Sequence, residues 1–130
     1  MLVAQNIDFM SLKDAPPARD DASTSGRGFA TTGGVAQAIV NTIHKVEPQY
    51  EVKTFCADGL HECMKMLKMA KAGKYDGYLL EGMGCPGGCI GGAGTLAPIQ
   101  KSSRELEKYK NASPYFTVQD NPLAPKHYGQ

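Results

Sequence analysis

The chain has 130 residues, which is one domain's worth of polypeptide and enough for a single modest core. Its 14 lysines and arginines nearly balance 13 aspartates and glutamates, so neither a nucleic-acid partner nor an anionic membrane surface is indicated. No apolar run is long enough to span a bilayer and the start lacks a secretory signal, so we expect a cytoplasmic protein. There the four cysteines are expected to be metal ligands or core residues rather than disulfides.

Residues 1–25 are predicted to form an N-terminal helix and a polar connector. Residues 2–12 are apolar enough for a short helix, but their spacing fits no single period. In the polar stretch 15–26, Pro16 and Pro17 exclude a helix interior, so we expect a loop there.

A helix is predicted after Gly34 and is ended by Pro48. The apolar positions on its predicted face recur at intervals of four, four and three: Val35, Ile39, Ile43 and Val46. Thr31 or Thr32 is expected to cap its start. The Gly33–Gly34 pair would leave free amides at the positive end of the helix, which favour an anionic group, although a tight turn also explains these glycines.

A strand, a helix and a strand are predicted next, which gives the α/β fold class. Residues 50–57 alternate and are rich in β-formers, and residues 78–80 form a short apolar run typical of a strand buried on both faces. The helix between them runs through Ala72 and stops at Gly73. Its predicted apolar stripe comprises Leu60, Cys63, Met64, Leu67 and Ala70. This order predicts a right-handed βαβ unit with parallel strands.

The α/β lobe is assigned to residues 26–112, and residues 113–130 to a C-terminal tail. Residues 97–111 are mostly charged and predict a surface helix. The tail is rich in proline and asparagine, so we expect it to wrap the body or fray.

The stretch 81–94, EGMGCPGGCIGGAG, is the candidate functional loop. It leaves the carboxyl end of a predicted parallel strand, where ligands sit in open α/β sheets. Cys85 and Cys89 form a C-x-x-x-C pair among glycines, with Pro86 between them. A redox dithiol would prefer two intervening residues and a zinc knuckle would need a second pair, so iron–sulfur ligation is favoured over a turn that happens to carry cysteines.

Other candidate residues have simpler structural explanations. Cys56 and Cys63 are predicted to be small buried apolar residues. Glu81 is either a general acid or base, or a salt-bridged carboxylate at a strand end. The three histidines are scattered and are assigned surface or capping roles: His44, His61 and His127.

Residues 81–94 resemble the last of the three cysteine motifs of the iron-only (FeFe) hydrogenases, E-x-M-x-C-x-x-G-C-x-x-G-G. Residues 28–35, GFATTGGV, resemble the G-x-[ST]-G-G-V entry to a helix in the same family. The resemblance covers most of the chain from about Gly26 onward, including S-P-Y at residues 113–115. Departures such as Ala30 indicate a divergent branch.

The resemblance implies a 4Fe–4S cluster with a di-iron subsite, the H-cluster. Cys85 would ligate the cubane, and Cys89 would both ligate it and bridge to the di-iron subsite. Met83 would pack beside that subsite, and Glu81 would have a proton-handling role. Three further residues would lie near the cluster: Phe29, Ala30 and Val35.

The two earlier cysteine motifs of the family, T-S-C-C-P and M-P-C-x-x-K, do not occur in these 130 residues. The resemblance therefore implies the C-terminal part of a hydrogenase catalytic domain whose partner is the missing N-terminal portion, with an electron carrier such as ferredoxin. We expect the isolated chain to be cluster-free, inactive and prone to homodimerise through an apolar face. The alternative is a non-catalytic iron–sulfur or zinc-binding module that uses Cys85 and Cys89 at a homodimer interface.

Overall fold

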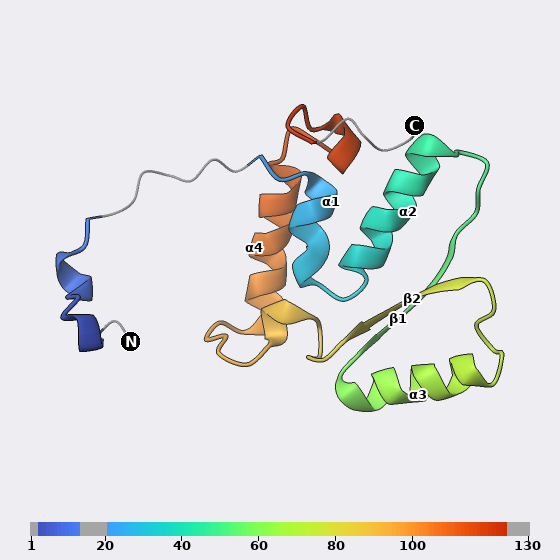
Figure 1. Ribbon diagram of the computed structural model, residues 1–130, viewed down its shortest axis with the longest axis horizontal. Helices are drawn as coiled ribbons and strands as arrows, with labels where there is room; N and C mark the ends of the chain where they lie inside the picture. Colours follow the sequence, from blue (N-terminus) through green and yellow to red (C-terminus); the bar gives the residue numbers. More distant parts are fainter. Residues whose placement is uncertain (1–2, 14–20, 125–130) are drawn as a thin grey trace.

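The structure is a computed structural model that describes residues 3–13 and 21–124. At its centre two parallel strands pair, with Cys56 opposite Glu81 in the register. Figure 1 shows this sheet between two helices, one on each face. The elements of this unit are α2 (Gly34–Val46), β1 (Lys53–Asp58), α3 (Leu60–Lys71) and β2 (Tyr78–Met83). The predicted strand–helix–strand unit with parallel strands is thus confirmed.

Side chains alternate between the two faces of the sheet, as the period of a strand requires. Glu81 points toward α2, to which its carboxylate is hydrogen-bonded. Its neighbour Gly82 faces α3, since a Cβ there would lie 3.2 Å from the Cys63 sulfur. Tyr78 is exposed and Leu80 only half-buried, so the expectation that β2 is buried on both faces was wrong. Two strands offer too little width for the flanking helices to cover it completely.

The inward face of α3 differs from the predicted stripe. Met66, which the stripe omitted, is 4% exposed and packs against the sheet beside Cys63. Three members of the predicted stripe are instead exposed: Leu60, Met64 and Leu67. The predicted stripe was the most apolar face of the helix. The face that packs on the sheet is instead the one that the connections to β1 and β2 turn toward the strands.

The predicted helix α2 is confirmed, but its apolar stripe does not form the main contact with the sheet. Ala36 is the α2 residue that is fully buried, at 2% exposure, whereas Ile39 and Val46 are exposed. A small side chain at the contact allows the helix to approach β2 closely.

The described N-terminal residues contain two short 3-10 turns, Val3–Gln5 and Phe9–Ser11, so the predicted helix over residues 2–12 was wrong. Asn6 between them has a positive φ of 53°, which interrupts any helix. The connector residues 14–20 lie outside the described part. A helical turn that was not predicted, α1 (Thr24–Arg27), begins within the expected loop, where the Ser23 hydroxyl accepts a hydrogen bond from the Gly26 amide at 3.1 Å.

The surface helix α4 (Ile99–Asn111) is confirmed, and the segment after it returns to α1 (Figure 1). The Thr24 amide donates to the Tyr115 carbonyl at 2.7 Å, and the Asn121 side-chain amide donates to the Asp21 carbonyl at 2.6 Å. This docked segment includes a short 3-10 turn, Val118–Asp120. Residues 125–130, which include His127, lie outside the described residues.

The hydrophobic core within the described residues is very small. Its fully buried apolar members are Ala36, Ala57 and Met66. Many large apolar side chains are exposed, which indicates that this unit does not bury its apolar surface by itself. Over the described ranges 3–13 and 21–124, no helix has both the length and the apolar character needed to cross a bilayer.

Candidate metal-binding site

The cysteine loop follows the carboxyl end of β2, as the sequence predicted, but β2 runs to Met83, so residues 81–83 of the predicted loop belong to the strand. Cys85 follows two residues later and is half-buried, whereas Cys89 opens a 3-10 turn, Cys89–Gly91, and is exposed. Neither thiol takes part in a disulfide. Both sulfurs are therefore carried at the rim of the sheet rather than in a closed apolar interior.

Short turns hold the loop in shape. The Gly88 amide donates to the Cys85 carbonyl at 3.0 Å, and the Gly92 amide donates to the Cys89 carbonyl at 3.1 Å. Gly92 also lies against the Cys85 sulfur, since a Cβ on Gly92 would come within 3.3 Å of it. The Gly91 amide donates to the Gly88 carbonyl at 3.0 Å as well, so three amides of the loop are engaged in its own turns.

The loop packs against the backbone of residues 30–32. A Cβ on Gly88 would come within 2.6 Å of the Ala30 carbonyl oxygen and 2.7 Å of the Thr32 amide nitrogen. The φ of Gly88 is 93°, which side chains rarely adopt, so glycine is required on two grounds. The Thr32 amide also donates to the Gly87 carbonyl at 3.4 Å. The structure thus brings together the two sequence segments that were singled out separately.

A residue that the sequence did not single out supports the other side of the loop. The Cδ1 of Ile99, the first residue of α4, would clash with a Cβ on Gly87 and lies 2.7 Å from the Cβ position of Gly91. A wedge of this kind leaves no motif in the sequence, because any apolar residue at the start of a charged helix could supply it.

Glu81 connects β2, the strand that leads into the cysteine loop, with the start of helix α2. Its Oε1 accepts a hydrogen bond from the Gly33 amide at 2.8 Å, and its Oε2 accepts one from the Ala36 amide at 2.7 Å. The expected threonine cap of α2 was wrong: Gly33 is the N-cap residue, with φ 84° and no side-chain hydrogen bond. The anionic group expected at this helix end is therefore a carboxylate of the same chain, and its partners are amides rather than a cation.

The two threonines expected to cap α2 have other partners. Thr32 donates its hydroxyl hydrogen bond to Asp58 Oδ2 at 2.9 Å, and Thr31 donates its own to the Gly28 carbonyl at 2.9 Å. Asp58 is the last residue of β1, so the Thr32 bond ties the 30–32 segment to the carboxyl end of β1 as well.

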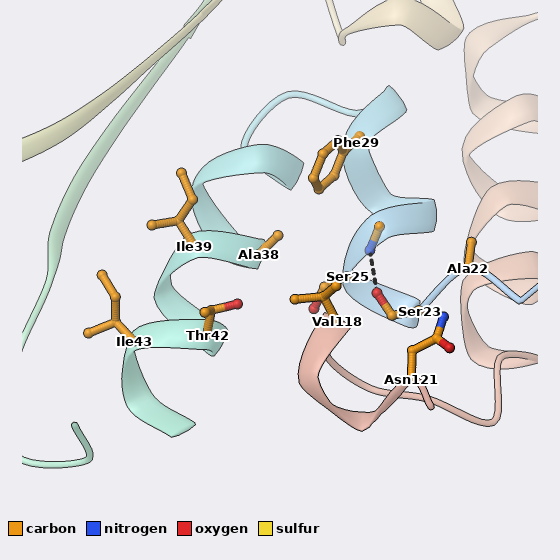
Figure 2. A pocket seen from close by; sticks show the side chains of 11 residues that line it. Ala22, Ser23, Ser25, Phe29, Ala38, Ile39, Thr42, Ile43, Val118 and Asn121 are labelled. Carbon is orange, nitrogen blue, oxygen red and sulfur yellow. Dashed lines mark hydrogen bonds between the residues drawn. The ribbon is translucent and has the colours of Figure 1, made fainter. Parts of the chain in front are cut away.

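The remaining predicted site residues lie at different distances from the loop. Ala30 contacts it through its carbonyl, Met83 ends the strand before it, and Val35 is half-buried in the first turn of α2. Phe29 instead points into an apolar pocket between α1, α2 and the C-terminal 3-10 turn (Figure 2). That pocket has a volume of about 430 Å³ and is also lined by Ile39, Ile43 and Val118. The structure does not bring Phe29 to the cysteines.

The two other cysteines pack against neighbouring elements, but both are only half-buried, so the expectation that they are buried was wrong. The Cys63 thiol donates a hydrogen bond to the Met83 carbonyl at 3.3 Å. Burial, and to a lesser extent the negative charge of Glu81, raise the pKa of the Cys56 thiol. Both changes disfavour a thiolate at Cys56, so this residue is a poor metal ligand where it stands. His44 and His61 are exposed, as expected for surface roles.

The donor set of the loop fits part of an iron–sulfur cluster. A 4Fe–4S cube takes four protein ligands, and thiolates are its usual ones. Within residues 3–13 and 21–124, no three or more histidine, cysteine or acidic side chains gather as a metal site. Cys85 and Cys89 are two thiols, so the described residues do not gather the four ligands that such a cluster takes.

Two comparisons with known proteins bear on this site. The profile of the family described as "Iron only hydrogenase large subunit, C-terminal domain" matches residues 1–93, beginning earlier than the resemblance from about Gly26 suggested. The chain is also 27% identical over 150 aligned residues to the NADP-reducing hydrogenase subunit HndD of Solidesulfovibrio fructosivorans. That alignment covers 94% of this chain and 25% of the relative, so the chain spans about a quarter of that protein's length.

Proposed function

Because the chain belongs to the family of C-terminal domains of iron-only hydrogenases, we propose that it supplies two cysteine ligands, Cys85 and Cys89, of the H-cluster. In the complete protein of this family the cofactors are an iron–sulfur cluster and the H-cluster. The proposed reaction is the reversible interconversion of protons and electrons with dihydrogen, with electrons exchanged with a carrier such as a ferredoxin. When bound, the cluster would supply the electron transfer and the chemistry on hydrogen.

One observation carries the proposal: both thiols lie at an open rim directly beyond the carboxyl end of a parallel strand. Cys85 is half-buried and Cys89 is exposed, and neither is paired in a disulfide. Two thiols fixed by a self-bonded glycine loop can approach a bulky inorganic group without side chains in the way. A loop that had only a structural role would have no need to present either sulfur outward.

The other residues of the site would shape the space beside the cluster. The backbone of residues 30–32, pressed against Gly88, forms a wall on one side of the loop. Met83 is half-buried at the end of β2 and would pack an apolar side chain beside the di-iron subsite. These residues would exclude water and fix the thiolates, and they carry no charge of their own.

The remaining ligands would come from the portion of a hydrogenase catalytic domain that carries the other cysteine motifs. The exposed apolar surface supports this proposal, and the clearest part of it is on α3. Leu60 is 74% exposed, and Met64 and Leu67 continue the same stripe along the helix at spacings of four and three residues. Stripes of this spacing are typical of a helix face that a partner covers.

The position of this stripe indicates what would cover it. Leu60 lies near Gly84, 3.9 Å from its Cβ position, on the flank of α3 that faces the β2 side of the sheet. Glu62 and Lys65, on the opposite flank, line a hollow with residues of β1. β2 has no partner strand on its outer edge within the described residues. A partner segment could therefore pair with β2 and bury the stripe at the same time.

The proposal is tested by anaerobic iron–sulfide reconstitution of the chain alone, and of the chain mixed with a separately expressed hydrogenase portion that carries the other cysteine motifs. Iron and sulfide are then quantified in the purified species. We expect retained cluster only in the mixed complex, and we expect Cys89→Ser to abolish it. Cys63→Ser is the matched control, because Cys63 lies on α3 with its thiol engaged by the Ala57 and Met83 carbonyls, bonds that a serine hydroxyl can also make, and it should leave the cluster content unchanged.

A different result would favour the alternative function. If the chain alone retains one cluster or zinc ion per two chains, and Cys85→Ser removes it, the chain is a homodimeric metal-binding module and not a partial ligand set. Failure of the mixed complex to hold iron, with both parts folded, would overturn the proposed ligand role.

A further inference from the structure

The contact between Glu81 and the start of α2 joins segments that are distant in the sequence. Both carboxylate oxygens accept backbone hydrogen bonds, one from Gly33 at 2.8 Å and one from Ala36 at 2.7 Å. Glu81 is 9% exposed. The first-turn amides of a helix lack partners within the helix and carry a partial positive charge, so a buried carboxylate here is satisfied without a cation.

The same two segments meet a second time at the cysteine loop. Four residues after Glu81 comes Cys85, and beyond it Gly88 presses against the backbone of Ala30 and Thr32. On the other segment, Thr32 directly precedes Gly33. The Glu81 carboxylate and the Gly88 backbone contact therefore hold the chain on both sides of Cys85, and Cys89 directly follows the second contact.

We propose that Glu81 is a positioning residue that locks the cysteine loop against residues 30–32 and so fixes the direction in which Cys85 and Cys89 present their sulfurs. This inference rests on the proposed function only for the identity of the group that the sulfurs hold. The lock itself is a property of the chain without any cluster.

The geometry favours this role over a general acid or base. A group that exchanges protons during a reaction needs an accessible oxygen within reach of the proton. In Glu81 both oxygens are held by amides and the side chain is nearly covered by protein. Protonating either oxygen would remove the negative charge that strengthens both hydrogen bonds and would weaken the connection between β2 and α2.

The substitution Glu81→Gln tests the lock directly. Glutamine keeps the size of the side chain but places an NH₂ group opposite one of the two amides, where no acceptor remains. In the chain without cluster, we expect amide hydrogen exchange at Gly33 or Ala36 to accelerate by about tenfold or more. We also expect alkylation of Cys85 to accelerate several-fold, toward the rate of Cys89.

Two measurements separate positioning from a general loss of stability. Amide exchange at Met66, in the α3 layer, should stay within about twofold of the parent chain, because that layer does not contact the carboxylate. The matched control is Glu62→Gln, which neutralises an exposed glutamate paired with Lys65 on α3 and should change neither cysteine.

The inference is overturned if Glu81→Gln loosens the Gly33 and Ala36 amides but leaves the Cys85 alkylation rate unchanged, since Glu81 is then a helix cap and nothing more. If Glu81→Gln does not fold, Glu81→Asp carries the same test, because it keeps the charge but is shorter by one methylene. If Cys85 is alkylated faster in Glu81→Gln but the mixed complex of the parent chain holds no iron, the lock is supported and the proposed ligand role is overturned. If the mixed complex holds iron but Glu81→Gln leaves the Cys85 alkylation rate unchanged, the ligand role is supported and the lock is overturned.

Discussion

Gly88 lies so close to Ala30 that the Cβ of any other residue at position 88 would approach the Ala30 carbonyl oxygen to 2.6 Å. This contact presses the cysteine loop onto the segment that begins α2. Gly88→Ala should therefore lower the free energy of unfolding by about 1–3 kcal/mol more than a positive φ alone explains. Chemical denaturation followed by circular dichroism measures the difference.

The chain offers a matched control for this substitution. Gly73 also has a positive φ, 83°, but a Cβ there would meet nothing within 4 Å. Gly73→Ala should therefore lower the free energy of unfolding by only about 1–2 kcal/mol, the cost of the left-handed conformation. Equal losses at the two positions would show that the close approach of the two backbones has no energetic weight.

The four cysteines should react with an alkylating reagent in an order set by their surroundings. Cys89 is exposed and should react first, followed by the half-buried Cys85, whereas the thiol of Cys63 is hydrogen-bonded to backbone carbonyls. Cys56 should react last at neutral pH, because burial and the charge of Glu81 raise its pKa and so reduce its thiolate fraction. Mass spectrometry of timed samples gives the four rates, and denatured chain should show them converging.

The raised pKa of Cys56 has a defined consequence for stability. The folded state binds the Cys56 thiol proton more tightly than the unfolded state does. The resulting contribution to the free energy of unfolding is complete below the ordinary thiol pKa and is lost as pH rises through the raised pKa of Cys56 in the folded state. Glu81→Gln removes the smaller of the two causes, so the pKa of Cys56 should fall part of the way back. An unchanged Cys56 titration in that variant would mean that burial alone sets its pKa.

The docked tail contains a pH-sensitive contact. The ion pair with Lys45 and, to a smaller extent, hydrogen bonds from the Thr117 amide and hydroxyl lower the pKa of Asp120 to about 2. The stabilisation is present above the ordinary aspartate pKa and is lost as pH falls through about 2. Carboxyl NMR titration should show this low midpoint, and Lys45→Met should raise it. A midpoint that does not move in the variant would exclude the ion pair as the main cause.

The apolar stripe of α3 should matter for association and not for folding. Leu60→Gln combined with Leu67→Gln replaces two exposed side chains, so the free energy of unfolding should change by no more than about 0.5 kcal/mol per site. Binding to the hydrogenase portion that carries the other motifs should weaken at least tenfold by calorimetry. Leu96→Gln is the control, because Leu96 is also exposed but lies in the loop before α4. Equal effects of the two changes would remove α3 from the proposed interface.

Local sequence patterns were sufficient to predict the α/β class, the βαβ unit and the place of the cysteine loop. Strand alternation, helical spacing and the cysteine motif each involve residues that are close together in the sequence, so each can be recognised from a short stretch of it. The Glu81 contact was not predicted, because its partners Gly33 and Ala36 are separated from it by 48 and 45 residues. Neither the contact of Ile99 with the cysteine loop nor the burial of Met66 against the sheet can be predicted from neighbouring residues, since each depends on how two elements pack in the folded chain.

The carboxylate that completes the first turn of α2 also imposes an order on biosynthesis. Ala36 leaves the ribosome 45 residues before Glu81 does, so α2 emerges with its leading amides facing only water. The helix should gain its final register only when β2 has been translated and has added itself beside β1. Ribosome-arrested chains in which residue 81 has not yet been added should therefore have a frayed α2 start at Gly33. Chains long enough for residue 81 to have passed the tunnel exit should have an ordered one.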